Sequence, residues 1–172
     1  MSETVRISIA DATDLISDAL MASGASEAQA RPTAIALASA EAEGQVGHGF
    51  SRLEDYAAQV RSGKINRDAA MTVNALRPAS ILINADCGFA YPAIDRAISE
   101  LVPVAKEMGI AIAAVGNSHH CGALSLQVEK LANAGLIGLM FTNAPKAIAP
   151  WGSNQPLFGT NPIAIGVPRA KV

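Results

Sequence analysis

The chain has few aromatic residues, few cysteines and no long run of charges of one sign. Aromatic side chains make up 4% of its 172 residues, whereas 50% of the residues are hydrophobic. A core built from this composition must consist mainly of Ala, Ile, Leu and Val. The length is sufficient for a folded domain with a real core, and the hydrophobic content excludes a disordered chain.

Charge and cysteine content exclude further classes of protein. The formal net charge is −2, and no basic stripe with interleaved aromatics is present, so we expect no nucleic-acid partner. The apolar runs are too short to cross a bilayer and the N-terminus lacks the apolar segment of a secretory signal. We therefore expect a cytoplasmic protein without a membrane partner. Cys87 and Cys121 are too few for a disulfide scaffold and are expected to be free thiols.

Residues 1–70 are predicted to form an N-terminal helical segment. Apolar residues at helical spacing indicate a helix over residues 11–22. Capping-box patterns beginning at Ser26 and Ser51 predict two more helices, one to about residue 43 and one to Gly63. Pro32 is expected to delay or bend the second helix. Three glycines among residues 44–49 form an elbow that presents His48.

Residues 71–172 are predicted to form a mixed α/β domain, which makes the fold class α/β. The strand expected over residues 110–115 is predicted to be buried, and Pro103 is expected to kink or end the helix that precedes it. The other elements follow from apolar runs bounded by Gly, Pro and Asn. We expect strands over 71–76, 80–85, 136–141 and 163–167, and helices within 88–109 and over 123–133.

The alternation of strands and helices suggests a Rossmann fold, but its fingerprint is missing. A dinucleotide site of that type needs G-x-G-x-x-G between the first strand and its helix. The nearest candidate runs from Gly116 to Gly122, has five residues between its glycines, and contains two bulky histidines. No Walker A sequence is present either. We therefore expect an α/β fold of another type.

His48 and Arg52 are the first candidates for site residues. Flanking glycines leave the backbone of His48 free to aim its ring, although an incidental histidine in a loop is an equal alternative. Arg52 lies in the first turn of the next predicted helix, where the helix dipole disfavours a cation. Such a placement is explained if the guanidinium faces a substrate carboxylate. The alternative is an ordinary surface arginine.

His119 and His120 follow the strand predicted over residues 110–115, at a position where α/β proteins carry their chemistry. Neighbouring side chains point in different directions, so we expect one histidine to face a site and the other to pack or cap. The contiguous run with Cys121 lacks the spacing of a zinc site, and we expect no metal. Cys121 is expected to be a small apolar filler. The helix predicted from Ala123 could present backbone N–H groups to an anion.

Two later segments share a polar pair followed by a turn, at residues 142–145 and 159–162. Each could offer hydroxyl, amide and backbone groups to a ligand, and each could equally be turn chemistry. The only tryptophan, Trp151, lies in the long loop between them. It is expected to be a lid, a docking contact or an anchor of the loop.

Taken together, these motifs resemble the malate/L-lactate dehydrogenase family whose members lack a Rossmann fold. The resemblance extends over essentially the whole chain. It rests on the motifs H-G-x-x-R-L-x-x-Y from His48, S-H-H-C-G-A from Ser118, T-N from Thr142, A-P-W-G from Ala149 and G-T-N-P from Gly159.

The resemblance implies an NAD- or NADP-dependent oxidoreductase that is active as a homodimer. Hydride would be exchanged between the nicotinamide and a small carboxylate substrate, either a 2-hydroxy or 2-oxo acid or a cyclic 2-imino acid. His120 would supply or take the proton, while His48 and Arg52 would line the substrate site. The cofactor contacts implied by the resemblance are Asn143, Ala144, Thr160 and Asn161.

Two departures from the family pattern affect the expected function. Gly47 stands where the family often has serine, so one hydroxyl contact to the substrate is lost. The chain also covers only about the first half of a family member, so the cofactor-binding domain is expected to be incomplete. The alternatives are therefore an enzyme completed by a separate C-terminal chain, or a non-catalytic truncated remnant. A metal-dependent hydrolase or lyase that uses His119 and His120 is the third hypothesis.

Overall fold

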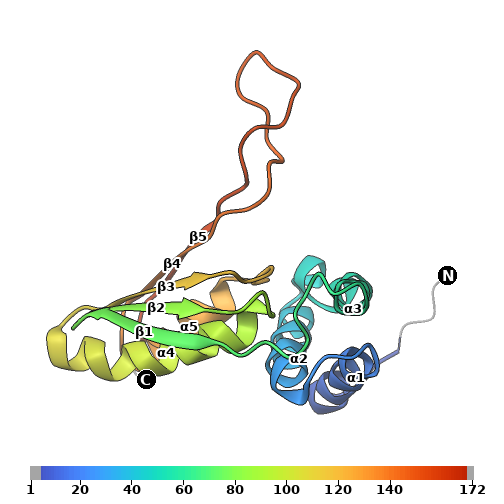
Figure 1. Cartoon of the computed structure of the whole chain (residues 1–172), viewed down its shortest axis with the longest axis horizontal. Coiled ribbons are helices and arrows are strands. Elements are labelled where there is room, and N and C mark those ends of the chain that lie inside the picture. Colours follow the sequence, from blue (N-terminus) through green and yellow to red (C-terminus); the bar gives the residue numbers. More distant parts are fainter. Residues whose placement is uncertain (1–4, 170–172) are drawn as a thin grey trace. The chain divides into compact units, whose positions relative to one another are not determined.

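A computed structural model describes residues 5–169 of the chain, which divides into two compact units. The first unit ends at Ala123 and the second begins at Leu124. The expected change from helices to strands near residue 70 lies inside the first unit. A domain boundary at residue 70 remains a prediction. The mixture of helices and small sheets confirms the predicted α/β class (Figure 1).

The first unit begins with three helices, as the apolar spacing predicted. They are α1 (Ile9–Ala22), α2 (Glu27–Ala42) and α3 (Leu53–Arg61), with two short 3₁₀ turns, η1 (Val46–His48) and η2 (Phe50–Arg52), before α3. α1 and α2 pack on each other through fully buried large residues and through alanines, which allow close approach of the two helices. The large residues of this core are Ile16, Leu20 and Leu37.

The helix starts differ in part from the predicted capping boxes. α1 begins at Ile9, earlier than expected, because the Ser8 hydroxyl accepts a hydrogen bond from the backbone N–H of Asp11. Ser26 is the N-cap residue of α2 as predicted, although its side chain makes no capping bond. The prediction for Ser51 was wrong, because this residue lies within η2 and its hydroxyl donates to the carbonyl of Val46.

A three-stranded sheet completes the first unit. β1 (Thr72–Arg77) pairs antiparallel with β2 (Ser80–Asn84), and β2 pairs parallel with β3 (Ile112–Gly116). The crossover between the parallel strands is α4 (Ala90–Met108), which packs on one face of the sheet. The interface between α4 and the sheet is a core of aliphatic residues: Ile81, Ile83, Ala85, Ala93 and Ala97.

The structure corrects three expectations about the elements. Pro103 does not end α4, which continues to Met108, and Pro32 does not delay the start of α2, which begins at Glu27. Packing along each helix therefore outweighs the one hydrogen bond that a proline removes. A kink or bend at either proline remains a prediction. The strand predicted over residues 110–115 begins at Ile112 and is not buried on both faces, since Ile112 is 65% exposed.

The second unit consists of one helix, a two-stranded sheet and a long loop. α5 (Ser125–Asn133) packs on the antiparallel pair β4 (Gly138–Phe141) and β5 (Ile163–Gly166). Glycines make this packing close, because a Cβ at Gly138 would lie 2.8 Å from the side chain of Leu131. α5 starts two residues later than the predicted helix. The opposite face of the sheet exposes four large apolar side chains, Leu139, Phe141, Ile163 and Ile165.

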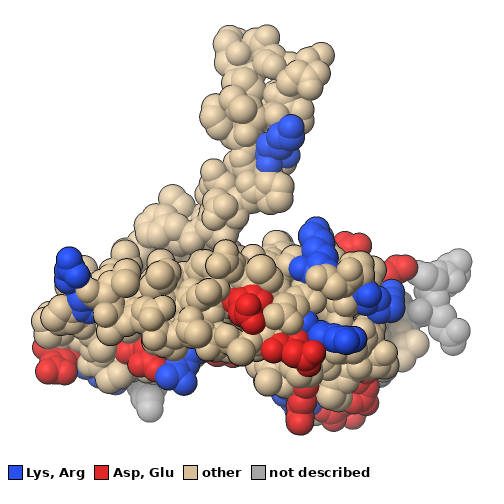
Figure 2. All heavy atoms as spheres, viewed as in Figure 1, with Lys and Arg blue, Asp and Glu red and all other residues tan. Residues whose placement is uncertain are grey.

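Residues 142–162 form a loop that extends away from the ends of β4 and β5 (Figure 1). An isolated antiparallel bridge between Ile148 and Phe158 joins the two arms of the loop. Lys146 is its only charged residue, and the space-filling view shows an almost uncharged projection (Figure 2). Trp151 is fully exposed in this loop. Within residues 5–169, no helix is both long and apolar enough to cross a membrane.

Candidate active site

The glycine-rich elbow of the first unit is held by Glu41 of α2. Oε2 of Glu41 accepts a hydrogen bond of 2.9 Å from the backbone N–H of Phe50. Gly49 is required at this point, because a Cβ there would collide with the Glu41 side chain. The turn that carries His48 is thereby fixed against α2 rather than left as a flexible loop. Sequence reasoning did not identify Glu41, which lies in an ordinary helical pattern.

Arg52 closes the same elbow from the other side. Its Nε donates to the carbonyl of Gly47 over 2.6 Å, and its Nη1 lies 3.9 Å from Oδ2 of Asp55. The side chain is partly exposed, so the remaining guanidinium N–H groups are available to an anion such as a carboxylate. The structure therefore gives Arg52 a structural contact in addition to the ligand-binding role that was predicted from its helix position.

His120 is anchored by a pair of buried tyrosines. Its Nδ1 lies 2.7 Å from the hydroxyl of Tyr56 in α3, and that hydroxyl lies 3.2 Å from the hydroxyl of Tyr91 in α4. The tyrosines are 3% and 2% exposed, whereas His120 is buried on the side that contacts Tyr56 and exposed elsewhere. Only the Nδ1 edge of the imidazole is thus committed to the protein among the described residues. The Nε2 edge is left for proton exchange with a ligand.

The two candidate histidines of the first unit lie side by side. The rings of His48 and His120 stack with centroids 5.5 Å apart and planes at 19°. Burial and the positive charge of Arg52 lower the pKa of His48 below its usual value of 6.5. Burial, then His48 and then Arg52 lower the pKa of His120 in the same way. Both imidazoles are therefore biased toward the neutral form.

His119 takes no part in this cluster. Its Nε2 lies 2.8 Å from the carbonyl of Lys64, which follows α3, so this histidine ties the loop after β3 to the end of a helix. Of the two adjacent histidines, His119 therefore packs, and only His120 lies in the cluster with His48 and Tyr56. Cys121 is buried, in line with a filler role. Over residues 5–169 no group of three His, Cys, Asp or Glu side chains is arranged to hold a metal ion.

Tyr91 was missed by sequence reasoning. It lies in the first turn of α4, in a stretch that reads as an ordinary apolar helix face. The loop after His120 closes over it, because Gly122 has a φ of 64° and a Cβ there would collide with the Tyr91 hydroxyl. A signal was present, since the chain has only two tyrosines and a buried tyrosine hydroxyl requires a partner.

The four predicted cofactor contacts lie together in the second unit, at the base of its long loop. The side-chain Oδ1 of Asn161 accepts a 2.9 Å hydrogen bond from the backbone N–H of Ala144, which joins the two segments. The side chains of Asn143 and Thr160 are exposed beside this contact. An amide and a hydroxyl are suited to the carboxamide and ribose of a nicotinamide nucleotide. The residues present therefore fit such a group.

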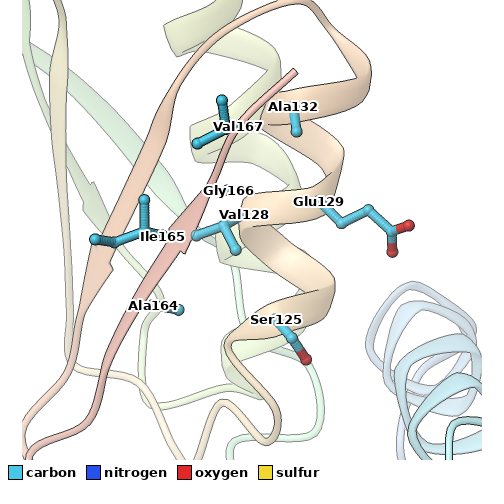
Figure 3. A pocket seen from close by; sticks show the side chains of 8 residues that line it. All are labelled: Ser125, Val128, Glu129, Ala132, Ala164, Ile165, Gly166 and Val167. Atoms are coloured by element: carbon cyan, nitrogen blue, oxygen red, sulfur yellow. The ribbon is translucent and has the colours of Figure 1, made fainter. Parts of the chain in front are cut away.

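A separate groove of about 390 Å³ lies in the second unit between α5 and β5. Figure 3 shows its mainly apolar lining, in which Val128 and Ala132 of α5 lie beside the strand residues 164–167. Glu129 is its only charged residue. None of the predicted site residues lines this groove, so it adds nothing to the candidate chemistry.

The geometry of the first unit combines two neutral-biased histidines and an arginine, a set suited to proton transfer beside a carboxylate. The sequence model of the malate/L-lactate dehydrogenase family matches residues 7–172. The chain belongs to this family. It is 45% identical over 163 residues to a (2R)-3-sulfolactate dehydrogenase (NADP(+)) of Chromohalobacter salexigens, covering 95% of this chain and 49% of that relative.

Other members of the family show similar coverage. A Δ1-pyrroline-2-carboxylate reductase of Ancylobacter novellus is 39% identical over 168 residues, which cover 98% of this chain and 49% of the relative. The solved structure of a Δ1-piperideine-2-carboxylate reductase from Pseudomonas syringae matches with a TM-score of 0.92 and 38% identity, over 97% of this chain and 50% of that one. The chain thus spans about half the length of the curated relatives it matches.

Proposed function

We propose that this chain carries the acid–base and carboxylate-binding part of a nicotinamide-dependent oxidoreductase. Its substrate would be a small 2-hydroxy or 2-oxo acid, or a cyclic 2-imino acid. The observation that supports this proposal most is the cluster in which His48 stacks on His120 while Tyr56 holds Nδ1 of His120. The chemistry named for the family relatives, reduction or oxidation next to a carboxylate, requires such a proton donor.

The proposed roles follow from which groups remain available. Nε2 of His120 would give a proton to the substrate oxygen or nitrogen during reduction and take it back during oxidation. Arg52 would bind the substrate carboxylate with the guanidinium N–H groups that Gly47 does not use. His48 would line the site beside His120. Gly47 brings no hydroxyl to this site, which affects the choice among substrates.

The cofactor is proposed to be NAD or NADP. Asn143 and Thr160 would contact it with exposed side chains, while Ala144 and Asn161 would shape the loop through their mutual hydrogen bond. When bound, the nicotinamide supplies or accepts the hydride. The residues of this chain would bind it, orient it and control the proton.

The proposal extends to partners and location. We propose a homodimer in the cytoplasm, with both cysteines kept as thiols, and no nucleic-acid or membrane partner. A separate C-terminal chain is proposed as a further partner. Denaturing intact mass of native material tests this, because a second polypeptide that co-purifies supports a two-chain enzyme, and a single 17.7 kDa species contradicts it.

The catalytic proposal is tested by following oxidation of NADH and of NADPH with a panel of substrates. The panel contains oxo acids of the malate, lactate and sulfolactate type and the cyclic imines Δ1-pyrroline- and Δ1-piperideine-2-carboxylate. Turnover that His120→Ala removes supports the proposal. A well-folded sample that oxidises neither cofactor contradicts it for this chain and favours the non-catalytic remnant. Stoichiometric zinc by elemental analysis would instead revive the metal-dependent hydrolase or lyase.

A further inference from the structure

We propose that Tyr56 and Tyr91 act together as positioning residues that hold neutral His120 in the tautomer with its proton on Nε2. The inference starts from a row of three groups, in which the Tyr91 hydroxyl lies 3.2 Å from the Tyr56 hydroxyl and the latter lies 2.7 Å from Nδ1 of His120. Each contact is a hydrogen bond, and which group donates depends on which acceptors are available to the phenolic protons and to Nδ1–H.

Only one arrangement of protons satisfies every donor in this row. If Tyr91 donates to Tyr56 and Tyr56 donates to Nδ1 of His120, both phenolic protons are used. In the reverse arrangement Nδ1–H donates to Tyr56 and Tyr56 donates to Tyr91, which leaves the Tyr91 proton without an acceptor. Among residues 5–169, Tyr56 is the only hydrogen-bond partner of the Tyr91 hydroxyl. Since Tyr91 is 2% exposed, bulk water does not replace the missing partner, and the first arrangement is favoured.

The surroundings favour the same arrangement. Burial raises the pKa of Tyr56 to about 12, so its phenol keeps its proton at neutral pH and can donate it. The charged and titratable groups around His120 are His48, Arg52, the two tyrosines and Cys121, which acts on both tyrosines. None of them is a carboxylate that would draw a proton to Nδ1, and Asp55 faces Arg52 instead. Neutral His120 therefore accepts at Nδ1 and carries its proton on the open Nε2 edge.

This tautomer would also affect the reaction, an inference that rests on the proposed function. In the resting protein an Nε2–H group offers a hydrogen bond to the oxygen of a 2-oxo acid or the nitrogen of an imine, and so orients the acceptor of the proton. Reduction then uses the imidazolium, which gives up its Nε2 proton and becomes a neutral ring with its proton on Nδ1. This Nδ1–H tautomer, with Nε2 unprotonated, is the form that takes the proton back during oxidation. When His120 is protonated, Nδ1–H donates to Tyr56 and Tyr56 turns to Tyr91, so Nδ1 keeps a partner in both states. A tyrosine hydroxyl can make this reversal, whereas a carboxylate or a backbone carbonyl cannot.

The tautomer is tested on the full chain by long-range ¹H–¹⁵N correlation of histidine side chains, which needs no turnover. The chain has three histidines, and His48→Asn and His119→Asn variants assign the signals. We expect an unprotonated Nδ1 and a protonated Nε2 for neutral His120. Tyr56→Phe should convert this into a mixture of tautomers, and Tyr91→Phe should produce a smaller change. A protonated Nδ1 in the parent protein, or an unchanged ratio in Tyr56→Phe, would overturn the proposal.

Kinetics then test the positioning role separately. Tyr56→Phe keeps the aromatic ring and should lower kcat about tenfold, the loss expected when one hydrogen bond to an ionisable group is removed, with KM for the substrate unchanged. An unchanged kcat beside an altered tautomer ratio would overturn the catalytic meaning of the pair. Absence of turnover in the parent protein would count against the proposed function, while the tautomer assignment would still stand or fall by the spectra.

Discussion

His48 and His120 stack with their ring centroids 5.5 Å apart, although one lies in the elbow after α2 and the other follows β3. The stack brings two imidazoles next to the guanidinium of Arg52, whose charge acts on both of them. Three positive or potentially positive groups in one place are costly unless the histidines stay neutral or an anion binds. A carboxylate ligand would therefore relieve an electrostatic conflict that is built into the free protein.

Replacing His120 by alanine should lower kcat/KM for the preferred substrate by about 10²–10⁴-fold, the usual contribution of a general acid or base. The free energy of unfolding should fall by about 1–3 kcal/mol, because the buried Tyr56 hydroxyl loses the acceptor of its proton. Steady-state kinetics and thermal denaturation measure the two effects.

His119→Ala is the matched control for this variant. It removes the neighbouring histidine, whose Nε2 contacts the carbonyl of Lys64 outside the cluster. We expect kcat within about threefold of the parent value, since the lost contact is one ordinary hydrogen bond. A control that loses as much activity as His120→Ala would show that the wrong histidine has been assigned.

Arg52→Lys should raise KM for the carboxylate substrate by about tenfold or more, because an ammonium cannot reproduce a two-pronged guanidinium contact. Lysine also loses the Nε bond to Gly47, so the elbow is expected to loosen. Asp55→Asn is the control, since it removes only the distant, exposed ion pair with Arg52. An unchanged KM in Arg52→Lys would show that this side chain does not hold the carboxylate.

The activity in the reducing direction should rise as the pH falls below about 6.5, because proton donation requires the imidazolium form and the pKa of His120 is lowered. The oxidising direction needs the unprotonated form and should keep its activity at higher pH. Arg52→Gln removes one cause of the lowered pKa and should move the profile toward higher pH. NMR titration of the histidine ring protons locates the shift independently of turnover, and a His120 pKa above 6.5 would contradict the prediction.

The same lowered pKa values affect stability. Below about pH 6.5 the unfolded chain binds protons at His48 and His120 that the folded protein does not yet bind. The free energy of unfolding should therefore decrease as the pH falls from 6.5 toward the lowered pKa values. Urea unfolding at several pH values measures this slope. In the double variant His48→Asn/His120→Asn the slope over this window should be smaller, and an equal slope would contradict the assignment.

The sequence predicted the elements of this fold better than their contacts. The helical stripes and Gly109 identified the helices, because these signals are local. The role of Tyr91 could not be predicted in this way, since its partner Tyr56 lies on another helix and the two meet only through packing. Pro103 does not mark the last turn of α4 for a related reason, because the sheet that packs against α4 stabilises a helix that would end earlier in isolation. His48, Arg52 and His120 were found from motifs, but their mutual geometry required the structure.

The loop over Tyr91 should not tolerate a side chain at Gly122. Substitutions at three glycines distinguish the two possible causes, which are backbone strain and collision with the Tyr91 hydroxyl. Gly116→Ala adds a methyl group in open space without a left-handed backbone, so the free energy of unfolding should hardly change. Gly44→Ala also meets open space, but its φ of 78° makes it strained by about 1 kcal/mol. Gly122→Ala combines a φ of 64° with a collision against the Tyr91 hydroxyl. Overpacking should add about 1–3 kcal/mol to the strain at this position.

Chemical denaturation of the three variants measures these differences, and the order Gly116, Gly44, Gly122 is the prediction. Gly122→Ala should in addition displace Tyr91 and so weaken its hydrogen bond to Tyr56, which the His120 spectra would report as a change in tautomer ratio. Combining Gly122→Ala with Tyr91→Phe removes the hydroxyl that the new methyl group meets. The double variant should therefore recover part of the lost stability. If it recovers none, the collision does not cause the destabilisation and backbone strain alone explains the glycine.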